Sequence, residues 1–458
     1  MNLCPSQSLV AACVAALLAG CSLMPAYERP EPPVPAAFPY GSPSDQRGAA
    51  DLEWQQFFPD GTLRTLIAKA LANNRDLRVA ALNIEQVRAQ YDIRRADRFP
   101  TVGATVGGTR APGASGSSVT SYTAGIAFSS WEIDLFGRVA SLSEAALAQF
   151  FASEEGRKAV QVSLVASVAT TWLSLAADDE LLELTRRTLA TREDSLRLTR
   201  LRFENGVASE IDYRLAQSLA ETARATLAQL QRQRANDLNL LGLLLGEPVP
   251  PEFQTGATTQ AVRLPDLPAG TPSDVLVQRP DVRQAEQQLV AANANIGAAR
   301  AAFFPRITLT AGIGTASSDL SGLFGGGSWG WTAAPSLLQP IFDAGRNRAG
   351  LAAALAGRDI ALAQYERAIQ SAFREVADAL AARTTWSDQL QAQSGVVAAE
   401  EARTRLARLR YEAGAASYLD LLDAQRSLFT AEQLLVQTRL ARLQNQIQLY
   451  RALGGGWR

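Results

Sequence analysis

The chain contains 458 residues, with 44 Lys and Arg residues against 45 Asp and Glu residues and no histidine. A net charge of −1 provides no basic face, so no nucleic-acid partner is expected, and the absence of histidine excludes catalytic triads and metal ligands of that type. The three cysteines, Cys4, Cys13 and Cys21, lie at the extreme N-terminus, which leaves no pair to cross-link a folded domain. No glycine loop that could bind phosphate leads into a helix. The composition therefore predicts a protein that is not an enzyme and holds no metal.

The first 20 residues have the pattern of a signal peptide. The apolar run from Leu9 to Leu18 is too short to span a bilayer comfortably. The letters LAGC, which end at Cys21, resemble the bacterial lipobox, in which the peptide is cut before the cysteine and the thiol is acylated. This resemblance implies diacylglycerol and palmitate on Cys21 as the only cofactor, and Ser22 after it implies sorting to the outer membrane. The alternative is an ordinary secretory peptide with a stray cysteine. One feature departs from the signal-peptide pattern, because no Lys or Arg precedes the apolar run, where a basic segment is expected.

Residues 21–50 are rich in proline and cannot form a regular helix or a central strand, so we expect an extended, lipid-anchored arm. Helical spacing then begins at Leu63, Leu66 and Ile67 and ends at Pro100.

Two segments, 101–136 and 306–342, alternate apolar and small residues with period two and are each split by a loop rich in Gly and Ser. Aromatic residues near their ends and strands of about ten residues suit the wall of a transmembrane β-barrel. A soluble hairpin meander is the alternative. Four strand candidates cannot close a barrel, and an open sheet edge is not tolerated in lipid, so several chains must share one barrel.

A long helix is predicted from Arg138 to Asn205, about 100 Å at about 1.5 Å per residue. Residues at heptad spacing predict a coiled-coil seam: Val168, Leu175, Leu182, Leu189, Leu196 and Phe203. The uncharged run 159–177 is long enough to span a bilayer, but Gln, Ser and Thr dilute it, so we expect it to pack against neighbouring helices.

The chain is internally duplicated. The segment RFENGVASEIDYRLAQ, which starts at Arg202, returns 208 positions later as RYEAGAASYLDLLDAQ, which starts at Arg410. We therefore predict two structural repeats joined by a linker and followed by a short tail. The predicted bounds are 51–246 for the first repeat with its tip near 206–209, 247–271 for the linker, 272–454 for the second repeat with its tip near 414–417, and 455–458 for the tail.

The repeated segments predict the tips of two helical hairpins. A glycine ends each long helix in the left-handed conformation, and a Ser-x-x-Asp capping box starts each return helix. The residues concerned are Gly206, Ser209 and Asp212 in the first copy and Gly414, Ser417 and Asp420 in the second.

Four features carry a resemblance to a known family: the lipobox, the segment WQQFFPDGTLRTLIAKALANNRDLR, the two strand pairs, and both tips with the pattern G-x-x-S-x-x-D-x-x-x-A-Q. Together they resemble the TolC-type outer-membrane factors of tripartite efflux pumps, most closely the lipoprotein branch of OprM and the NodT-like proteins. The resemblance implies a mainly α fold with a β-barrel portion, in which four transmembrane strands and long coiled-coil hairpins assemble as a homotrimer. Its twelve-stranded β-barrel would stand in the outer membrane on an α-helical barrel that extends into the periplasm.

The same resemblance implies an exit duct that passively conducts drugs or other toxic solutes from an inner-membrane transporter and a periplasmic adaptor. The family's constriction, a leucine and an aspartate four residues on, corresponds here to Leu419 and Asp423. Rings of these side chains from three chains would exclude water and charge the lumen. Ordinary hairpin packing of Leu419 and a solvated position of Asp423 are the alternatives. The turns at Gly206 and Gly414 are candidate contacts for the adaptor.

Two other functions share many of these features. A type I protein-secretion duct has the same fold. A lipid-anchored periplasmic coiled-coil adaptor would have the lipobox and the hairpins, but it would not need two strand pairs flanked by aromatic residues.

Overall fold

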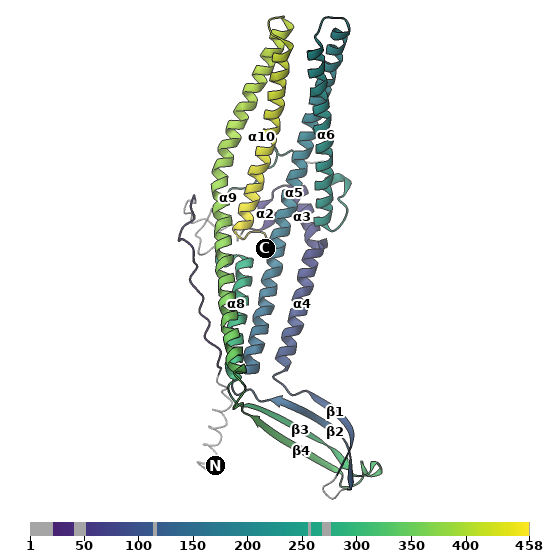
Figure 1. Ribbon diagram of the computed structural model, residues 1–458, viewed down its shortest axis with the longest axis vertical. Coiled ribbons are helices and arrows are strands. Elements are labelled where there is room, and N and C mark those ends of the chain that lie inside the picture. Colours follow the sequence, from purple (N-terminus) through teal and green to yellow (C-terminus); the bar gives the residue numbers. More distant parts are fainter. Residues whose placement is uncertain (1–21, 41–51, 113–116, 255–257, 268–275, 458) are drawn as a thin grey trace. The chain divides into compact units, whose positions relative to one another are not determined.

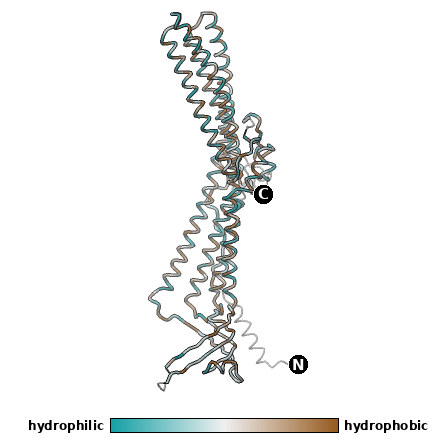
Figure 2. The backbone as a smooth tube through the Cα atoms, turned by 90° about the vertical axis from the view of Figure 1, so that its right-hand side faces the viewer, coloured by the Kyte–Doolittle hydropathy of each residue, from teal (hydrophilic) through white to brown (hydrophobic). Residues whose placement is uncertain are grey.

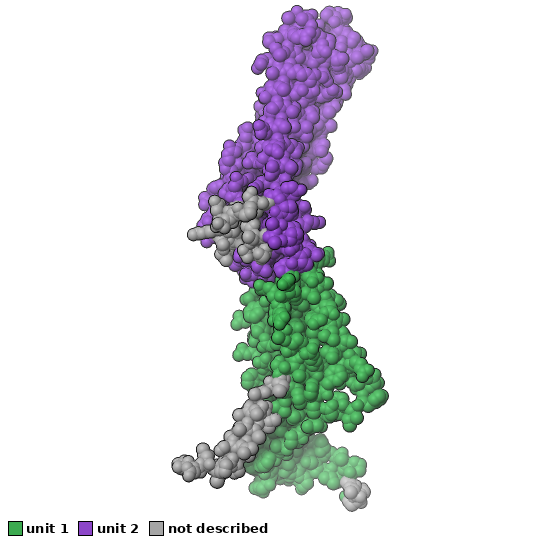
Figure 3. Space-filling view, turned by 90° about the vertical axis from the view of Figure 1, so that its left-hand side faces the viewer, with its two compact units in different colours: residues 1–31, 82–154, 284–367 green, residues 32–81, 155–283, 368–458 purple. Residues whose placement is uncertain are grey.

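The computed structural model (Figure 1) describes residues 22–40, 52–112, 117–254, 258–267 and 276–457. The predicted signal peptide and Cys21 lie outside these ranges. The chain divides into two compact units (Figure 3). Unit 1 comprises residues 1–31, 82–154 and 284–367, and unit 2 comprises residues 32–81, 155–283 and 368–458.

Long helices and one sheet make up the described chain. The strands are β1 Val102–Pro112, β2 Ser118–Glu132, β3 Arg306–Ser317 and β4 Trp329–Leu338. The α-helices are α2 Trp54–Phe57, α3 Gly61–Asn73, α4 Arg75–Ala96, α5 Arg138–Glu204, α6 Glu210–Leu245, α8 Pro280–Ala301, α9 Arg346–Glu412 and α10 Tyr418–Ala452. Two 3-10 turns, η2 Pro251–Phe253 and η3 Leu320–Gly322, complete the set. Helices α4, α5, α8 and α9 each contribute residues to both units, and each unit takes segments from both predicted repeats.

The sheet of unit 1 is antiparallel throughout, in the order β1-β2-β3-β4. Both predicted hairpins are present, and they join through β2 and β3, where Gly125 lies opposite Gly314. A Cβ added to Gly125 would lie 2.4 Å from the carbonyl oxygen of Ile313, so only glycine allows the strands to approach this closely. Within the described residues β1 and β4 have no further partner strand, and their side chains are exposed.

Acidic caps begin the long helices directly after the strands. Asp134 accepts hydrogen bonds from the backbone N–H groups of Arg138 and Ala140, both at 2.7 Å. Asp343 accepts one from the N–H of Asn347 at 2.8 Å. A carboxylate that bonds these N–H groups satisfies donors that have no partner within the helix.

In unit 1 residues 22–31 of the N-terminal arm pack on α8. Glu286 lies buried on α8 and accepts hydrogen bonds from Arg29 at 2.6 and 3.0 Å and from Tyr27 at 3.2 Å. Farther along α8, Asn293 donates to the carbonyl of Pro25, and a Cβ added to Gly297 would lie 2.9 Å from Met24 Cα. The arm therefore follows α8 closely, in the opposite direction.

The core of unit 2 gathers apolar residues from α2, α3, α5, α6, α9 and α10. Its centre is aromatic, because the ring of Phe57 stacks on Tyr450 with centroids 4.0 Å apart. The apolar part of α5 lies here, with Trp172 and Leu173 fully buried. Its most hydrophobic window would be long enough to cross a membrane, but 61% of that window is buried inside the protein. Hydrophilic residues also interrupt the apolar ones along the long helices in Figure 2. The run 159–177 thus packs against neighbouring helices, as its dilution with polar residues predicts.

The predicted seam of α5 is only partly correct. Leu175 and Leu182 are buried, whereas Leu189 is half-buried and Phe203 is exposed. Phe203 instead stacks on Tyr213 of α6, with ring centroids 5.6 Å apart. The predicted seam follows apolar residues alone, whereas toward the tip the buried face of α5 moves to another position of the heptad.

Candidate channel gate at the hairpin tips

The first hairpin tip is a tight turn between α5 and α6 in unit 2. Gly206 has φ of +72°, and the N–H of Val207 bonds the carbonyl of Arg202 at 2.7 Å. The Ser209 hydroxyl then accepts from the N–H of Asp212 at 3.1 Å, while the Asp212 carboxylate accepts from the N–H of Ser209 at 3.3 Å. The predicted left-handed glycine and capping box are both confirmed here.

The second tip, between α9 and α10, repeats this turn. Gly414 has φ of +69°, and Ser417 and Asp420 form the second predicted capping box, with hydrogen bonds of 3.2 and 3.0 Å. The Ser417 hydroxyl also donates to Asp420 at 2.8 Å, and this hydrogen bond lowers the pKa of the Asp420 carboxyl. The glycine, serine and aspartate of both tips are thus accounted for by the turn itself, without a ligand.

Leu419 and Asp423 lie one turn apart near the start of α10. The side chain of Leu419 is 57% exposed, although Leu421 and Leu422 beside it are buried. The side chain of Leu419 is therefore not buried within its own hairpin, and the same holds for Ile211 at the equivalent position of the first tip, which is 78% exposed.

Asp423 belongs to an ion-pair network that links α9 and α10. It bonds Arg403 of α9 at 2.5 Å and Arg426 of α10 at 2.6 Å, and Arg403 also pairs with Glu400 at 3.1 Å. The hydrogen bond from Arg403 is the main cause of the lowered pKa of Asp423. Asp423 is thus a half-exposed carboxylate that pairs with two arginines.

The sequence interpretation missed Arg403, Arg426 and Glu400. Two of the pairs have the i, i+3 spacing of helix neighbours and could have been found from that spacing. The pair between Arg403 and Asp423 requires the alignment of two antiparallel helices, in which residues at similar distances from the turn at Gly414 face one another.

The two tips are also joined to each other. The guanidinium of Arg202 at the end of α5 donates to the hydroxyl of Tyr411 at the end of α9. Tyr411 in turn packs against Tyr418 of α10, with ring centroids 5.5 Å apart. This contact connects the first hairpin to the second within one chain.

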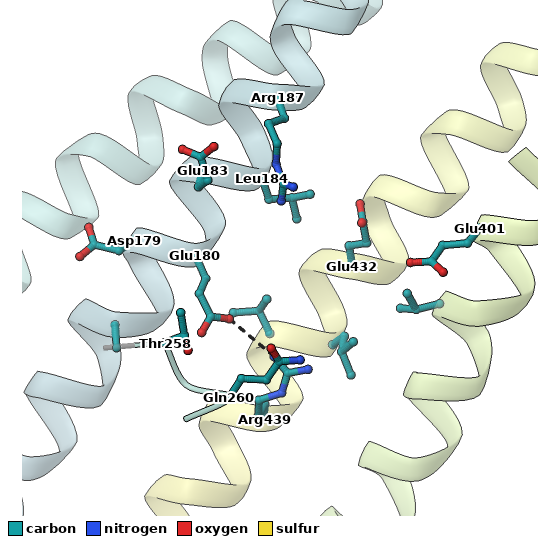
Figure 4. Close-up of a pocket in the computed structure, with 14 residues that line it drawn as sticks. Asp179, Glu180, Glu183, Leu184, Arg187, Thr258, Gln260, Glu401, Glu432 and Arg439 are labelled. Atoms are coloured by element: carbon teal, nitrogen blue, oxygen red, sulfur yellow. Dashed lines mark ion pairs between the residues drawn. The ribbon is translucent and has the colours of Figure 1, made fainter. Parts of the chain in front are cut away.

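A separate cavity of about 480 Å³ lies between α5, α9 and α10 in unit 2 (Figure 4). Glu180 and Arg439 form an ion pair of 3.6 Å there, and burial raises the pKa of Glu432. Most of the charged side chains that line it are acidic. Across the described ranges, however, no group of three His, Cys, Asp or Glu residues could hold a metal ion.

Comparison with known proteins gives a consistent result over nearly the whole chain. Residues 66–247 and 271–455 match a family model described as outer membrane efflux protein. The probable efflux pump outer membrane protein TtgC of Pseudomonas putida is 48% identical, over 99% of this chain and 96% of that protein.

Two solved structures are similar in fold and sequence. A membrane protein from Pseudomonas aeruginosa superposes with a TM-score of 0.89 at 44% identity, covering 95% of this chain and 98% of that one. The open state of the Neisseria gonorrhoeae MtrE outer membrane channel gives a TM-score of 0.88 at 41% identity, covering 96% and 99% of the two chains.

Proposed function

The chain belongs to the outer membrane efflux protein family, and we propose that three copies of it form one duct that is closed at the second hairpin tips. Membership of the family makes the protein an outer-membrane exit duct of an efflux system, with the TolC-type fold of a helical barrel joined to a β-barrel. The family consists of transport ducts and is not a family of enzymes. The coiled-coil adaptor is excluded as an alternative, because the family match covers both strand pairs and both hairpins.

The open sheet supports the trimer. Each chain contributes four strands, and β1 and β4 leave their outer edges unpaired within the described residues. Unpaired backbone groups are costly in lipid, and the smallest membrane barrels have about eight strands. Three chains, joined edge to edge, would close a barrel of twelve strands.

We further propose that the duct works with a periplasmic adaptor and an inner-membrane transporter, and that it conducts small toxic solutes. Relatives carry the names toluene efflux pump and antibiotic efflux pump outer membrane protein, which supports solutes of this size. The exposed turns at Gly206 and Gly414 would be available to the adaptor. A type I protein-secretion duct of the same fold is the second candidate for the cargo.

The lipid anchor on Cys21 belongs to the same proposal. The described chain begins one residue later, and its arm is bound along α8 by Arg29 and Glu286. Mass spectrometry of the mature N-terminal peptide tests it: a diacylglyceryl mass on Cys21 that is lost in Cys21→Ala is expected, and an unmodified cysteine would contradict it.

The exposed Leu419 beside the Asp423 network carries the proposal for the gate. Leu419 would close the lumen to water, since an apolar ring dewets a narrow pore. The network of Glu400, Arg403, Asp423 and Arg426 contains two charges of each sign, so each chain compensates its own carboxylates. We therefore assign to Asp423 the role of holding α10 against α9, rather than that of charging the lumen.

Single-channel conductance in planar bilayers tests this gate. Wild-type protein should give small openings, and Leu419→Ala/Asp423→Ala should enlarge them severalfold. The matched control is Ile211→Ala/Leu215→Ala, which changes the equivalent positions of the first tip and should leave the conductance unchanged. Wide openings in wild type and all variants would place the gate elsewhere, and a folded protein without conductance would contradict the duct itself.

A further inference from the structure

Helix α5 buries a polar stripe toward its tip. Four polar residues at heptad spacing are almost inaccessible: Asp178 at 1% exposure, Thr185 at 0%, Arg192 at 7% and Thr199 at 5%. Leu175 and Leu182, which precede the first two by three residues, are buried as well. A coiled-coil seam usually has apolar side chains at both of its inner positions. In α5 one of the two positions is polar over four consecutive heptads.

One member of this stripe lacks a hydrogen bond. Within the described parts of the chain, Thr185 Oγ1 is buried and has no hydrogen-bond partner, whereas Asp178 shares a hydrogen bond with Asp237 of α6. A buried polar atom without a partner costs free energy in the packed state, and it recovers that cost when water reaches it. The stripe therefore stabilises the packing of α5 less than apolar side chains at the same positions would.

Arg192 is the one member of the stripe that reaches two other helices. Its Nη1 donates to the carbonyl of Leu219 on α6 at 3.0 Å, and its guanidinium carbon lies 5.1 Å from the ring centroid of Phe429 on α10. No carboxylate of the described residues forms an ion pair with it. Burial lowers the pKa of Arg192.

The contact with Phe429 connects the first hairpin to the helix that carries the gate residues. Leu419 and Asp423 lie on α10 only a few turns from Phe429. A guanidinium over an aromatic face is a directional attraction that strengthens when water is excluded. Farther from the tip, α10 also packs on α5 and α6 through an apolar cluster that includes Leu182, Leu230 and Val436. The contact of Arg192 with Phe429 lies nearer the tip and is the one that reaches the part of α10 next to Leu419 and Asp423.

We propose that Arg192 is a positioning residue of the closed duct, which seats Phe429 and with it the tip-side part of α10 against the first hairpin. This inference rests on the gate proposed above for the second tip. It assigns the contact that keeps the duct closed to side chains a few turns away from the constriction.

The fraction of time that single channels spend open tests the proposal. Phe429→Leu keeps an apolar side chain of similar size and removes the ring, so the open fraction should rise severalfold. Arg192→Ala should have a similar effect, and Arg192→Lys should retain most of the closed state because an ammonium also binds an aromatic face. The double variant Arg192→Ala/Phe429→Leu should be no more open than either single variant, since both remove the same contact.

The matched control is Arg197→Ala, an exposed arginine of α5 that pairs only with Asp194 at 3.4 Å. Its open fraction should equal that of wild type. Thermal unfolding of each variant separates a loss of positioning from a loss of folding, because a purely structural role would lower the melting temperature without changing the open fraction. That outcome would overturn the proposal.

Leu419→Ala/Asp423→Ala, measured in the same bilayers, separates this inference from the gate on which it rests. If this double variant opens while Phe429→Leu and Arg192→Ala stay as closed as wild type, Arg192 has no positioning role and the gate stands. If Phe429→Leu and Arg192→Ala open while the double variant stays closed, the contact positions a constriction that lies elsewhere on α10, and the gate assignment fails.

Discussion

The first and second hairpin tips have the same backbone turn but different side chains around it. Both turns have a left-handed glycine, with φ of +72° and +69°, followed by a Ser-Asp capping box. An exposed apolar residue follows both turns, Ile211 at 78% exposure in the first tip and Leu419 at 57% in the second. The second tip adds a set of ion pairs among Glu400, Arg403, Asp423 and Arg426. The equivalent residues of the first tip are Arg192, Ser195, Leu215 and Ser218.

The comparison shows that the residues that form the turn are different from those that we propose to close the duct. A glycine and a cap are sufficient to reverse the chain, because each satisfies groups that a helix end leaves unpaired. The ion pairs across α9 and α10 are not needed for the turn, since the first tip forms without them. The first hairpin also has an ion pair between its helices, Glu193 with Arg224 at 2.7 Å, but it has none at the positions equivalent to Arg403 and Asp423. We therefore propose that the pairs of Asp423 serve the constriction.

The largest effect on conductance is expected from removing the ion pair between Arg403 of α9 and Asp423 of α10. Arg403→Met removes the partner of Asp423 across the hairpin while keeping the length of the side chain, so conductance should increase severalfold. Ser195→Met, the same change at the equivalent position of the first tip, should leave conductance unchanged. Equal effects of the two variants in planar bilayers would show that the copies do not differ in function.

A pH response of the stability is expected from Asp178 of the first copy. Burial raises the pKa of Asp178 from 3.8 to about 7. The charge of Asp237, its hydrogen bond with Asp178 and the charge of Asp179 add to this rise, and Arg234 opposes it. Between these two values the folded chain holds a proton that the unfolded chain has released, so stability falls as pH rises from about 4 to 7.

The measurement is the melting temperature across this range of pH. Asp178→Asn should flatten the dependence and melt higher than wild type above pH 7, because the neutral amide cannot ionise. The equivalent residue of the second copy is Trp386, which cannot titrate. An unchanged dependence in Asp178→Asn would assign the response to other groups.

Replacing either turn glycine should have a smaller effect, on local stability, and the effect should be equal at the two tips. Gly206→Ala and Gly414→Ala place a Cβ in the left-handed region, which costs about 1–2 kcal/mol. Hydrogen exchange of the tip amides should show this loss as faster local opening. Gly395→Ala is the control, because an added Cβ meets nothing within 4 Å in the middle of α9, and that variant should exchange no faster. Unequal losses at the two tips would mean that the turns are not equivalent.

The smallest effect is expected from the caps. Ser209→Ala and Ser417→Ala each remove one hydrogen bond to a helix N–H and should cost about 1 kcal/mol of local stability. The same exchange measurement applies, with Ser195→Ala as the control for a serine that caps no helix. No change at either tip would contradict the energetic role of the capping boxes.

The parts of the fold that depend on neighbours in sequence were predictable. Both turns, both strand pairs and the long helices follow from glycine positions, capping spacing and period-two alternation. The ion pair of Arg403 with Asp423 could not be predicted from the sequence, because it depends on how two antiparallel helices align. The burial of Arg192 was not predictable either, since a charged residue on a helix is most often solvated and only the packed structure shows Phe429 over it.

The N-terminal arm has a mechanical consequence. Its contacts pair Leu23 with Arg300, Pro25 with Asn293 and Arg29 with Glu286, so the arm and α8 run antiparallel. A force that pulls on the N-terminal end along α8 loads these contacts at the same time, in shear, and they share the load. A force directed away from α8 loads them one after another, starting at Leu23, and peels the arm off. The same attachment is therefore strong in one direction of pull and weak in another.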